Sequence, residues 1–375
     1  MPVYTYTILD DPSSVGFDTH ASGINDAGQV VGAYNHHGFL YSPGASNPWI
    51  NIDDPLATEY TVAKDITATG LIVGYYRTST NHGFIYNPST GVYSTFDPPG
   101  SAYTIAYDIN NAGQIVGEYE DNVGSGLHGF LLNGSVYTIL NDPLGSHGTA
   151  ASGINSFGQI VGYYFDDAFK EHGFLYNPSN GSFTTLDNPL GTQTGLTGIN
   201  DFGQIVGHYI SADFHTHGFL YSGGTYTPLD LPNSSITLVS GINNAGVISG
   251  TYEDSSRGTH GFILTITPNP PPPAGTTADM ILRASNSSQL AGQYEIYDIG
   301  NNAILSGNSL GQVGTDWQYA GLGGFFSSDT SDMLLRNSTT GGFQVYDISN
   351  NNITGSAFPR QRRLGLAGHG LRQFQ

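Results

Sequence analysis

The chain has 375 residues, with 30 acidic side chains against 10 basic ones and a formal net charge of −20. Phosphate binding requires clustered lysine and arginine, so neither a nucleic-acid partner nor an anionic membrane surface is expected. Cysteine is absent, which excludes disulfides, thiolate nucleophiles and cysteine metal sites. No apolar run approaches the roughly 20 residues of a transmembrane helix, so we expect no membrane insertion.

Residues 4–12, YTYTILDDP, open the chain with a β-branched and aromatic run that ends in Asp-Asp-Pro. This composition is typical of a strand that stops at a turn. Because the fold would use this segment as a strand, we expect no N-terminal signal peptide in the chain.

Six copies of one phrase follow. Its core reads GIN-x-x-GQIVG-x-Y and then, after a variable stretch, HGFLY. Each copy holds four short runs bounded by Gly, Asn, Asp and Pro, which predicts four strands, and no window has a sustained helical period. Four antiparallel strands repeated about an axis predict an all-β protein, a six-bladed β-propeller over residues 1–266. The glycine of the HGF element marks the copies at intervals of 43 to 46 residues: Gly38, Gly83, Gly129, Gly173, Gly218 and Gly261.

The fourth-strand element predicts how the ring closes. It ends in an Asp-Pro-type turn and follows five of the copies, as in WINIDDP at 49–55, but the sixth copy runs directly into prolines. The missing element is the one at 4–12, so we expect the N-terminal strand to complete the sixth blade and leave no open sheet edge. The alternative is an open solenoid of stacked hairpins, whose end units would differ from the rest.

Strand order also predicts two faces. If strands run outward from the axis, the Asn-x-x-Gly turns, such as Asn155 to Gly158, lie on one face, here called the turn face. The loops after the second and fourth strands share the opposite face, the loop face. Variable loops on a regular scaffold are where binding usually occurs. The predicted binding surface comprises residues 10–21, 53–64, 97–107, 120–127, 142–151, 165–171, 210–216 and 253–259.

A histidine precedes each HGF glycine on the loop face. Six histidines could act as metal ligands or general bases, but equivalent positions on separate blades lie too far apart to share one metal. We therefore expect each imidazole to hydrogen-bond loop backbone at the start of the third strand, and we expect no metal or other cofactor. As a loop-face binding set, these residues are His37, His82, His128, His172, His217 and His260.

Acidic and aromatic residues recur on the same face. The aspartates of the Asp-Pro-type turns could form an acidic ring, but aspartate near proline is also ordinary turn chemistry. Adjacent pairs such as Asp53 and Asp54 have the residue types of a glycosidase, without a motif that singles them out. Tyrosines ending the second strands could stack on sugars or pack between blades. The binding candidates are Asp54, Asp97, Asp142, Asp187, Asp230, Tyr76 and Tyr164, and no catalytic residue is assigned.

The repeated phrase resembles the bacterial extracellular repeat proteins of the HAF family, in both of its halves and across roughly residues 22–265. The resemblance implies a secreted or surface repeat protein. It brings no established activity and no catalytic residues to this chain.

A proline-rich linker at 267–277 separates the repeats from a second region. There, ADMILR at 278–283 is echoed by SDMLLR at 331–336, each followed by a Tyr-Asp-Ile strand. This region resembles FG-GAP/VCBS-type repeats, which form propeller blades, so residues 278–358 are expected to form an incomplete β-repeat domain. Too few carboxylates precede the two Asp-Met pairs to supply the six to eight oxygens that Ca²⁺ prefers, so no calcium is expected.

Residues 359–375, PRQRRLGLAGHGLRQFQ, break the composition with four of the eight arginines. We expect this tail to be disordered. One hypothesis is a frameshift, because another reading frame with permitted codons resembles the repeat at 310–325. The alternative is a genuine basic tail that binds an acidic partner.

These features favour a monomeric, non-enzymatic binding module that acts outside the bacterial cell or on its surface. Its partner would be a glycan or a protein on the loop face. The alternatives are a polysaccharide hydrolase or lyase with carboxylates near the central channel, and a structural spacer. An enzyme should break the repeat symmetry with clustered acidic and basic residues at one channel mouth, whereas a binder should show shallow aromatic patches.

Overall fold

The computed structural model describes residues 3–14, 18–121 and 126–267, together with seven strands between residues 278 and 357. The chain divides into two compact units, of which the larger spans Tyr4–Ile266. All regular elements of the described residues are β-strands, which confirms the all-β prediction. Within these residues there is accordingly no helix with the length and apolar character needed to span a membrane.

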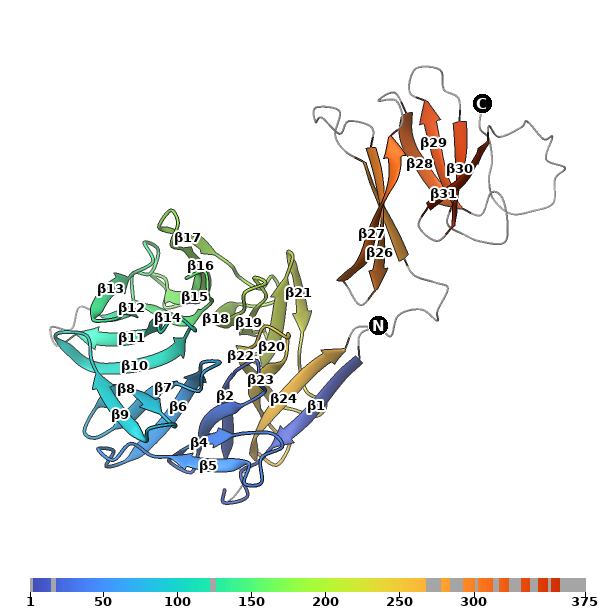
Figure 1. The fold of residues 1–375 in the computed structure, drawn as a ribbon. Helices are drawn as coiled ribbons and strands as arrows, with labels where there is room; N and C mark the ends of the chain where they lie inside the picture. The colour runs from blue at the N-terminus through green and yellow to red at the C-terminus, as the bar shows by residue number, and fades with distance from the viewer. Residues whose placement is uncertain are drawn as a thin grey trace. The chain divides into compact units, whose positions relative to one another are not determined.

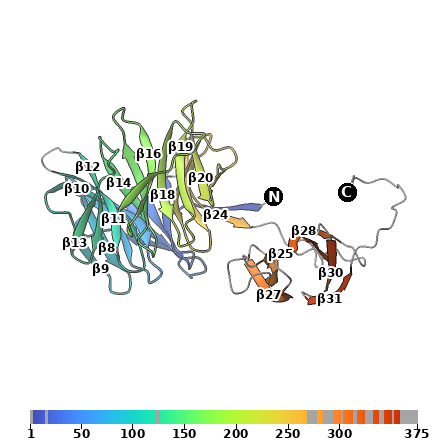
Figure 2. The same ribbon diagram turned by 90° about the horizontal axis from the view of Figure 1, so that it is seen from above.

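The larger unit consists of six four-stranded sheets (Figures 1 and 2). The first strand of each sheet lies next to the first strands of both neighbouring sheets, so these strands surround a central axis. This arrangement is the predicted six-bladed β-propeller. The blades are β2–β5 (Thr19–Ile24, Val30–Tyr34, His37–Tyr41, Trp49–Ile52), β6–β9 (Tyr60–Ile66, Ile72–Arg77, Asn81–Asn87, Val92–Phe96), β10–β13 (Ser101–Ile109, Ile115–Asp121, Leu127–Asn133, Val136–Leu140), β14–β17 (Thr149–Ile154, Ile160–Phe165, Glu171–Asn177, Ser182–Thr185), β18–β21 (Gln193–Ile199, Ile205–Ile210, Thr216–Ser222, Thr225–Pro228), and β22–β24 with β1 (Ile236–Ile242, Ile248–Glu253, Thr259–Thr267, Val3–Leu9).

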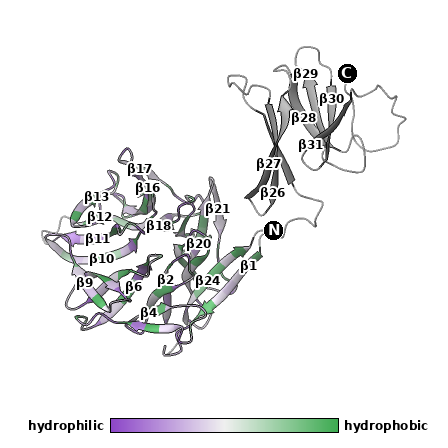
Figure 3. Cartoon of the chain, in the orientation of Figure 1, coloured by the Kyte–Doolittle hydropathy of each residue, from purple (hydrophilic) through white to green (hydrophobic). Residues whose placement is uncertain are grey.

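The sixth blade closes the ring as predicted. Its strand order is β1-β24-β23-β22, so the N-terminal strand supplies the outer edge of a sheet whose other strands end the repeats. Both β1 and β24 carry hydrophobic segments (Figure 3). Leu9 is 3% exposed, and Asp10 lies 3.0 Å from Nδ1 of His260. The open solenoid is therefore excluded as the fold of this unit.

The asparagine of the GIN element joins the blades at the turn face. Oδ1 of Asn155 accepts the N–H groups of Phe157 (3.1 Å) and Gln159 (3.0 Å), which shapes the turn around Gly158 at φ 74°. Its Nδ2 donates to the backbone oxygen of Asn200 in the next blade (3.3 Å). The same bond to the next blade is made by Asn25, Asn110, Asn200 and Asn243, and the last of these reaches Asn25 across the closure. In the second blade the position is occupied by Thr67.

The buried phenylalanine of the HGF element accounts for the glycine that recurs in IVG-x-Y, because the two residues face each other on neighbouring strands. Phe174 is fully buried and pairs with Gly162 on the neighbouring strand. A Cβ on Gly162 would lie 2.0 Å from the Ala150 oxygen and 2.9 Å from the Phe174 ring, so no larger residue fits. The packing repeats around the ring, where the other five phenylalanines are also 0% exposed: Phe39, Phe84, Phe130, Phe219 and Phe262.

The smaller unit contains two sheets, β25–β27 (Ala278–Arg283, Gln293–Gly300, Ala303–Gln312) and β28–β31 (Trp317–Gly323, Asp332–Asn337, Phe343–Ser349, Asn352–Ala357). The two copies share one register, because Met280 pairs with Tyr297 and Met333 pairs with Tyr346. The echo in sequence therefore corresponds to equivalent strand pairs. The linker at 268–277 and the tail after residue 357 lie outside the described residues, as do the predictions made for them.

Candidate functional site

Each loop-face histidine contacts a side chain at the end of the fourth strand of its own blade. Nδ1 of His172 lies 2.7 Å from Oδ2 of Asp187, and the imidazole stacks on Tyr164 with ring centroids 5.2 Å apart. The expectation of a backbone partner is therefore wrong, since a carboxylate or amide holds each ring. The other pairs, at 2.8–3.2 Å, are His37–Asp53, His82–Asp97, His128–Asn141, His217–Asp230 and His260–Asp10.

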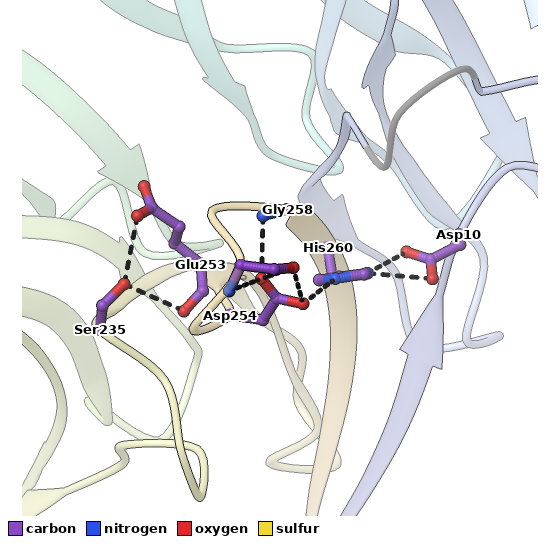
Figure 4. Close-up of polar contacts among 7 residues, drawn as sticks. Asp10, Ser235, Glu253, Asp254, Gly258 and His260 are labelled. Carbon is purple, nitrogen blue, oxygen red and sulfur yellow. Dashed lines mark hydrogen bonds and ion pairs between the residues drawn. The ribbon is translucent and has the colours of Figure 1, made fainter.

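Two of these histidines lie between two carboxylates. Figure 4 shows the His260 ring between Asp10 and Asp254, whose oxygens lie 3.0 and 3.4 Å from Nδ1 and Nε2. The N–H groups of Ser256 and Gly258 donate to Oδ1 of Asp254 and fix it in place. A metal could bind these rings only by displacing a carboxylate. Across the described part of the chain, no three His, Asp or Glu side chains gather in a way that could hold a metal ion.

The candidate aspartates occupy two structural positions. Asp97, Asp187 and Asp230 hold histidines, whereas Asp54 and Asp142 lie one position further along their loops and are buried, at 3% and 4% exposed. A buried aspartate of this kind accepts the N–H group two residues later and thereby forms the turn. The loops therefore do not present one ring of equivalent carboxylates, and Asp54 and Asp142 serve as turn formers.

The candidate tyrosines Tyr76 and Tyr164 are buried as well, at 4% and 3% exposed. Their hydroxyl groups lie 3.1 Å from Oγ1 of Thr95 and 3.0 Å from Oγ1 of Thr185 within the same blades. Their rings lie against His82 and His172, so packing accounts for the tyrosines. Among the predicted binding residues, the histidines and the aspartates that contact them are more exposed than the tyrosines.

Two shallow pockets open on the loop face where blades meet. The pocket between the first and second blades has a volume of about 210 Å³ and is lined by Asp18, His20, Tyr34, His36, Tyr60 and Tyr75. The pocket between the second and third blades has about 280 Å³ and is lined by Thr80, Asn81, His82, Asp97, Ser101 and Tyr103. Both combine aromatic rings with hydrogen-bonding groups. The predicted binding surface contains Tyr60 and Tyr103 only as members of its segments 53–64 and 97–107, and it leaves out Tyr75. None of the three was singled out, because the repeated phrase does not fix the residue type at their positions.

A separate cavity of about 100 Å³ lies in the central channel and opens at the turn face. Its wall is made by the two positions just before the recurring Ile-Asn pair, which is Ile66-Thr67 in the second blade. These two positions form a bulge in the first strand of each blade. Most blades place Ser or Thr followed by Gly there, as in Ser152-Gly153. The second and third blades instead have Lys64-Asp65 and Tyr107-Asp108. The repeat symmetry is therefore broken with acidic and basic residues at one channel mouth.

Sequence reasoning also missed this asymmetry. The signal was present, because AKDIT and AYDIN stand where the other blades have ASGIN, LTGIN or VSGIN. Only the register of the repeats, and not any local motif, distinguishes these two blades.

The channel carboxylates interact with each other and with neighbouring blades. Oδ2 of Asp65 accepts the N–H of Ile109 (3.2 Å) and Oδ2 of Asp108 accepts the N–H of Ile154 (2.8 Å). Burial raises the pKa of Asp65 well above its usual range, and the neighbouring Asp108 carboxyl, hydrogen-bonded to it, raises it further. Burial also raises the pKa of Asp108. Both carboxyl groups therefore hold a proton to a higher pH than exposed aspartates would.

Glu118 lies deeper between the blades. Burial raises its pKa, while hydrogen bonds from tyrosines oppose the shift. One of these donors is the hydroxyl group of Tyr163, 3.2 Å from Oε2 of Glu118. Glu118 thus has phenolic donors from its own blade, Tyr103 and Tyr107, and one from the next blade, Tyr163.

A second partly buried pair, Glu171 and His208, lies between the fourth and fifth blades, with Glu171 Oε1 3.7 Å from His208 Nε2. Gly195 leaves room for it, since a Cβ there would lie 2.3 Å from Glu171 Oε1. Burial raises the pKa of Glu171 to about 7 and lowers the pKa of His208 to about 4.

These two shifts predict opposite pH dependences of stability. The Glu171 contribution is fully present below pH 4.5 and is lost as pH rises through about 7, because the folded state binds the proton more tightly. The His208 contribution is fully present above pH 6.5 and is lost as pH falls through about 4. Between these limits the two contributions offset each other.

In Glu171→Gln only the His208 contribution remains, so we expect the free energy of unfolding to rise between about pH 4.5 and 6.5. In His208→Asn only the Glu171 contribution remains, so the free energy of unfolding should fall over the same range. Each change should be about 2 kcal/mol relative to the parent chain. Urea unfolding of the parent chain and both variants at the two pH values measures these differences. Parallel pH curves for all three proteins would contradict the prediction.

Residues 44–150, less than half of the chain, match a family described as "Protein of unknown function (DUF3466)". Comparison with curated protein sequences finds no match. Similar solved structures include putative TolB from Agrobacterium tumefaciens, at 11% identity over 72% of this chain and 99% of that one, with a TM-score of 0.49. Virginiamycin B lyase from Staphylococcus aureus has 12% identity over 90% and 97%, with a TM-score of 0.43. Aleuria aurantia lectin, in complex with alpha-methyl-L-fucoside, has 16% identity over 70% and 99%, with a TM-score of 0.43. These matches do not confirm the HAF or FG-GAP/VCBS resemblances.

Proposed function

We propose that this protein is an extracellular, non-enzymatic binding module that recognises a glycan on the loop face of its propeller. The observation that carries the proposal is the pocket between the first and second blades, where Tyr60 and Tyr75 meet His20, His36 and Asp18. Aromatic rings offer apolar faces to a sugar, and the imidazole and carboxylate groups can hydrogen-bond its hydroxyl groups.

The position of the pocket supports a binding role. It lies between blades, on the face that carries the most variable loops, and Tyr60 and Tyr75 occupy positions whose residue type the repeated phrase does not fix. Residues that the scaffold does not require are free to serve recognition. The pocket is also shallow, which suits a terminal sugar more than a buried cofactor.

A polysaccharide hydrolase acting in the channel is the weaker alternative. Asp65 and Asp108 supply the broken symmetry that an enzyme would need. Their cavity, however, has only about 100 Å³, which leaves no groove for a polymer chain. We therefore place the proposed glycan site on the loop face and not in the channel.

We expect Tyr60→Ala to weaken glycan binding about fivefold, because loss of one aromatic contact costs about 1 kcal/mol. A glycan array probed with the full chain first identifies the sugar, and titration of that sugar into parent and variant then gives the two affinities.

Gln193→Ala is the matched control, since Gln193 starts the first strand of the fifth blade as Tyr60 starts that of the second. It should bind like the parent chain. Failure of the parent chain to bind any sugar on the array, or equal losses in both variants, would refute the proposed loop-face function.

A further inference from the structure

Lys64 is one of only two lysines in the chain, and it lies in the central channel. It is the extra residue of a bulge in β6, where the register shifts between Ala63 and Asp65. The equivalent bulge residue in the fourth, fifth and sixth blades is Ser152, Thr197 or Ser240. The fold at this position therefore requires no lysine, and the long side chain is a specific feature of the second blade.

The amine of Lys64 has no carboxylate partner. Its Nζ lies 5.4 Å from the ring centroid of Tyr107. Among the described residues, no carboxylate oxygen comes within the 4.0 Å of an ion pair, although Asp65 and Asp108 line the same cavity and the charge of Glu118 acts on the amine from deeper between the blades. Burial lowers the pKa of Lys64, and the charges of Glu118 and Asp65 only partly oppose this shift. A larger fraction of the amine is thus uncharged and nucleophilic near neutral pH than in an exposed lysine.

Two further groups in the cavity are poised for proton transfer and hydrogen bonding. Burial and the neighbouring Asp108 carboxyl raise the pKa of Asp65 well above its usual range, so the Asp65 carboxyl can carry a proton and give it to a leaving oxygen. The hydroxyl group of Ser152, a residue 7% exposed, lines the same cavity and has no hydrogen-bond partner in the described structure. An unsatisfied buried hydroxyl group points to an occupant that can hydrogen-bond with it.

The charges of the cavity narrow the class of occupant. The wall carries groups of both signs, Lys64 and the aspartate pair, so it offers neither a cation nor an anion a uniformly favourable field. A small uncharged molecule with a carbonyl oxygen requires no such field and can accept a hydrogen bond from the Ser152 hydroxyl group. The cavity volume of about 100 Å³ also limits the occupant to a few heavy atoms.

We propose that Lys64 is a nucleophilic amine that forms an imine with a small aldehyde or ketone entering the channel from the turn face. The amine nitrogen attacks the carbonyl carbon, and one of its protons moves to the oxygen to give a carbinolamine. A proton from the Asp65 carboxyl passes to the hydroxyl group, which leaves as water while the carbon–nitrogen double bond forms. The iminium then returns a proton to the aspartate pair. The net reaction joins carbonyl and amine with loss of one water and requires no oxidant.

Reductive trapping on the full chain tests this proposal. Acetaldehyde and cyanoborohydride at pH 7 convert an imine into a stable ethylamine, which peptide mass spectrometry locates over time. Lys170 is an internal control, because it is exposed in the loop before β16. Lys64 should be ethylated faster than Lys170, since a lowered pKa increases the uncharged fraction of the amine. Equal or slower labelling of Lys64 would overturn the proposal, and so would labelling that occurs only after unfolding in urea.

Two variants test the role of the aspartate pair and the identity of the amine. Asp108→Asn should slow labelling of Lys64 severalfold and leave the rate at Lys170 unchanged. Lys64→Arg keeps the positive charge and should remove the channel adduct while the loop-face sugar affinity stays that of the parent chain. Unchanged Lys64 labelling in a folded Asp108→Asn variant would refute the proton-donor step. Because the channel and loop-face experiments use different ligands, failure of one is distinguishable from failure of the other.

Discussion

Replacing Phe174 with alanine should lower the free energy of unfolding of the propeller by about 3–5 kcal/mol. The ring is fully buried and lies on Gly162 of the neighbouring strand, where no side chain can move in to fill the space. The change removes apolar contacts and leaves a cavity between strands that are already paired. Urea unfolding monitored by circular dichroism measures the difference.

Phe157→Ala is the matched control in the same blade. Phe157 is 68% exposed in the turn between β14 and β15, so its loss should change stability by less than about 0.5 kcal/mol. A large difference between the two variants separates burial from residue type. If Phe174→Ala unfolds at the same urea concentration as the parent chain, the packing argument for the repeated HGF and IVG elements is wrong.

The repeat alone was sufficient to predict the architecture, because the same strand-forming and turn-forming residues recur in every copy and therefore predict the same four strands in every blade. Six copies of the phrase and one displaced fourth-strand element predicted the blade number and the closure, and both are confirmed. Partners across blades were harder to predict. Nothing near Asn155 in the sequence indicates that its side chain reaches Asn200, and nothing near His172 points to Asp187.

The candidate sites lay where the repeat pattern gives least information. Averaging over six copies made the recurring histidines and tyrosines prominent, yet Tyr76 and Tyr164 are packed under the histidines. Lys64 occurs in one blade only, Tyr60 has an equivalent only in Tyr103, and neither belongs to a motif. Their proposed roles follow from how deeply their side chains are buried and from which residues surround them. Both depend on how adjacent blades pack and on loop conformations, which the repeat period does not specify.

Removal of residues 1–11 should destabilise the propeller more than any single core substitution. The truncated chain loses the buried Leu9 side chain, the Asp10 contact with His260, and the backbone pairing between β1 and β24. Together these losses should exceed about 5 kcal/mol, a large part of the stability of an ordinary domain. The exposed edge of β24 should also make the chain associate at higher concentration. Urea unfolding and size-exclusion chromatography measure the two effects.

A synthetic peptide of residues 1–14 should restore stability to the truncated chain in a concentration-dependent manner, because a free strand can pair with an exposed sheet edge. The same peptide with Leu9→Ala and Asp10→Ala keeps the backbone pairing and loses the side-chain contacts, so it should rescue far less. Equal rescue by both peptides would mean that closure depends on backbone pairing alone. A truncated chain that unfolds like the parent would mean that the other strands of the sixth blade hold the ring closed without β1.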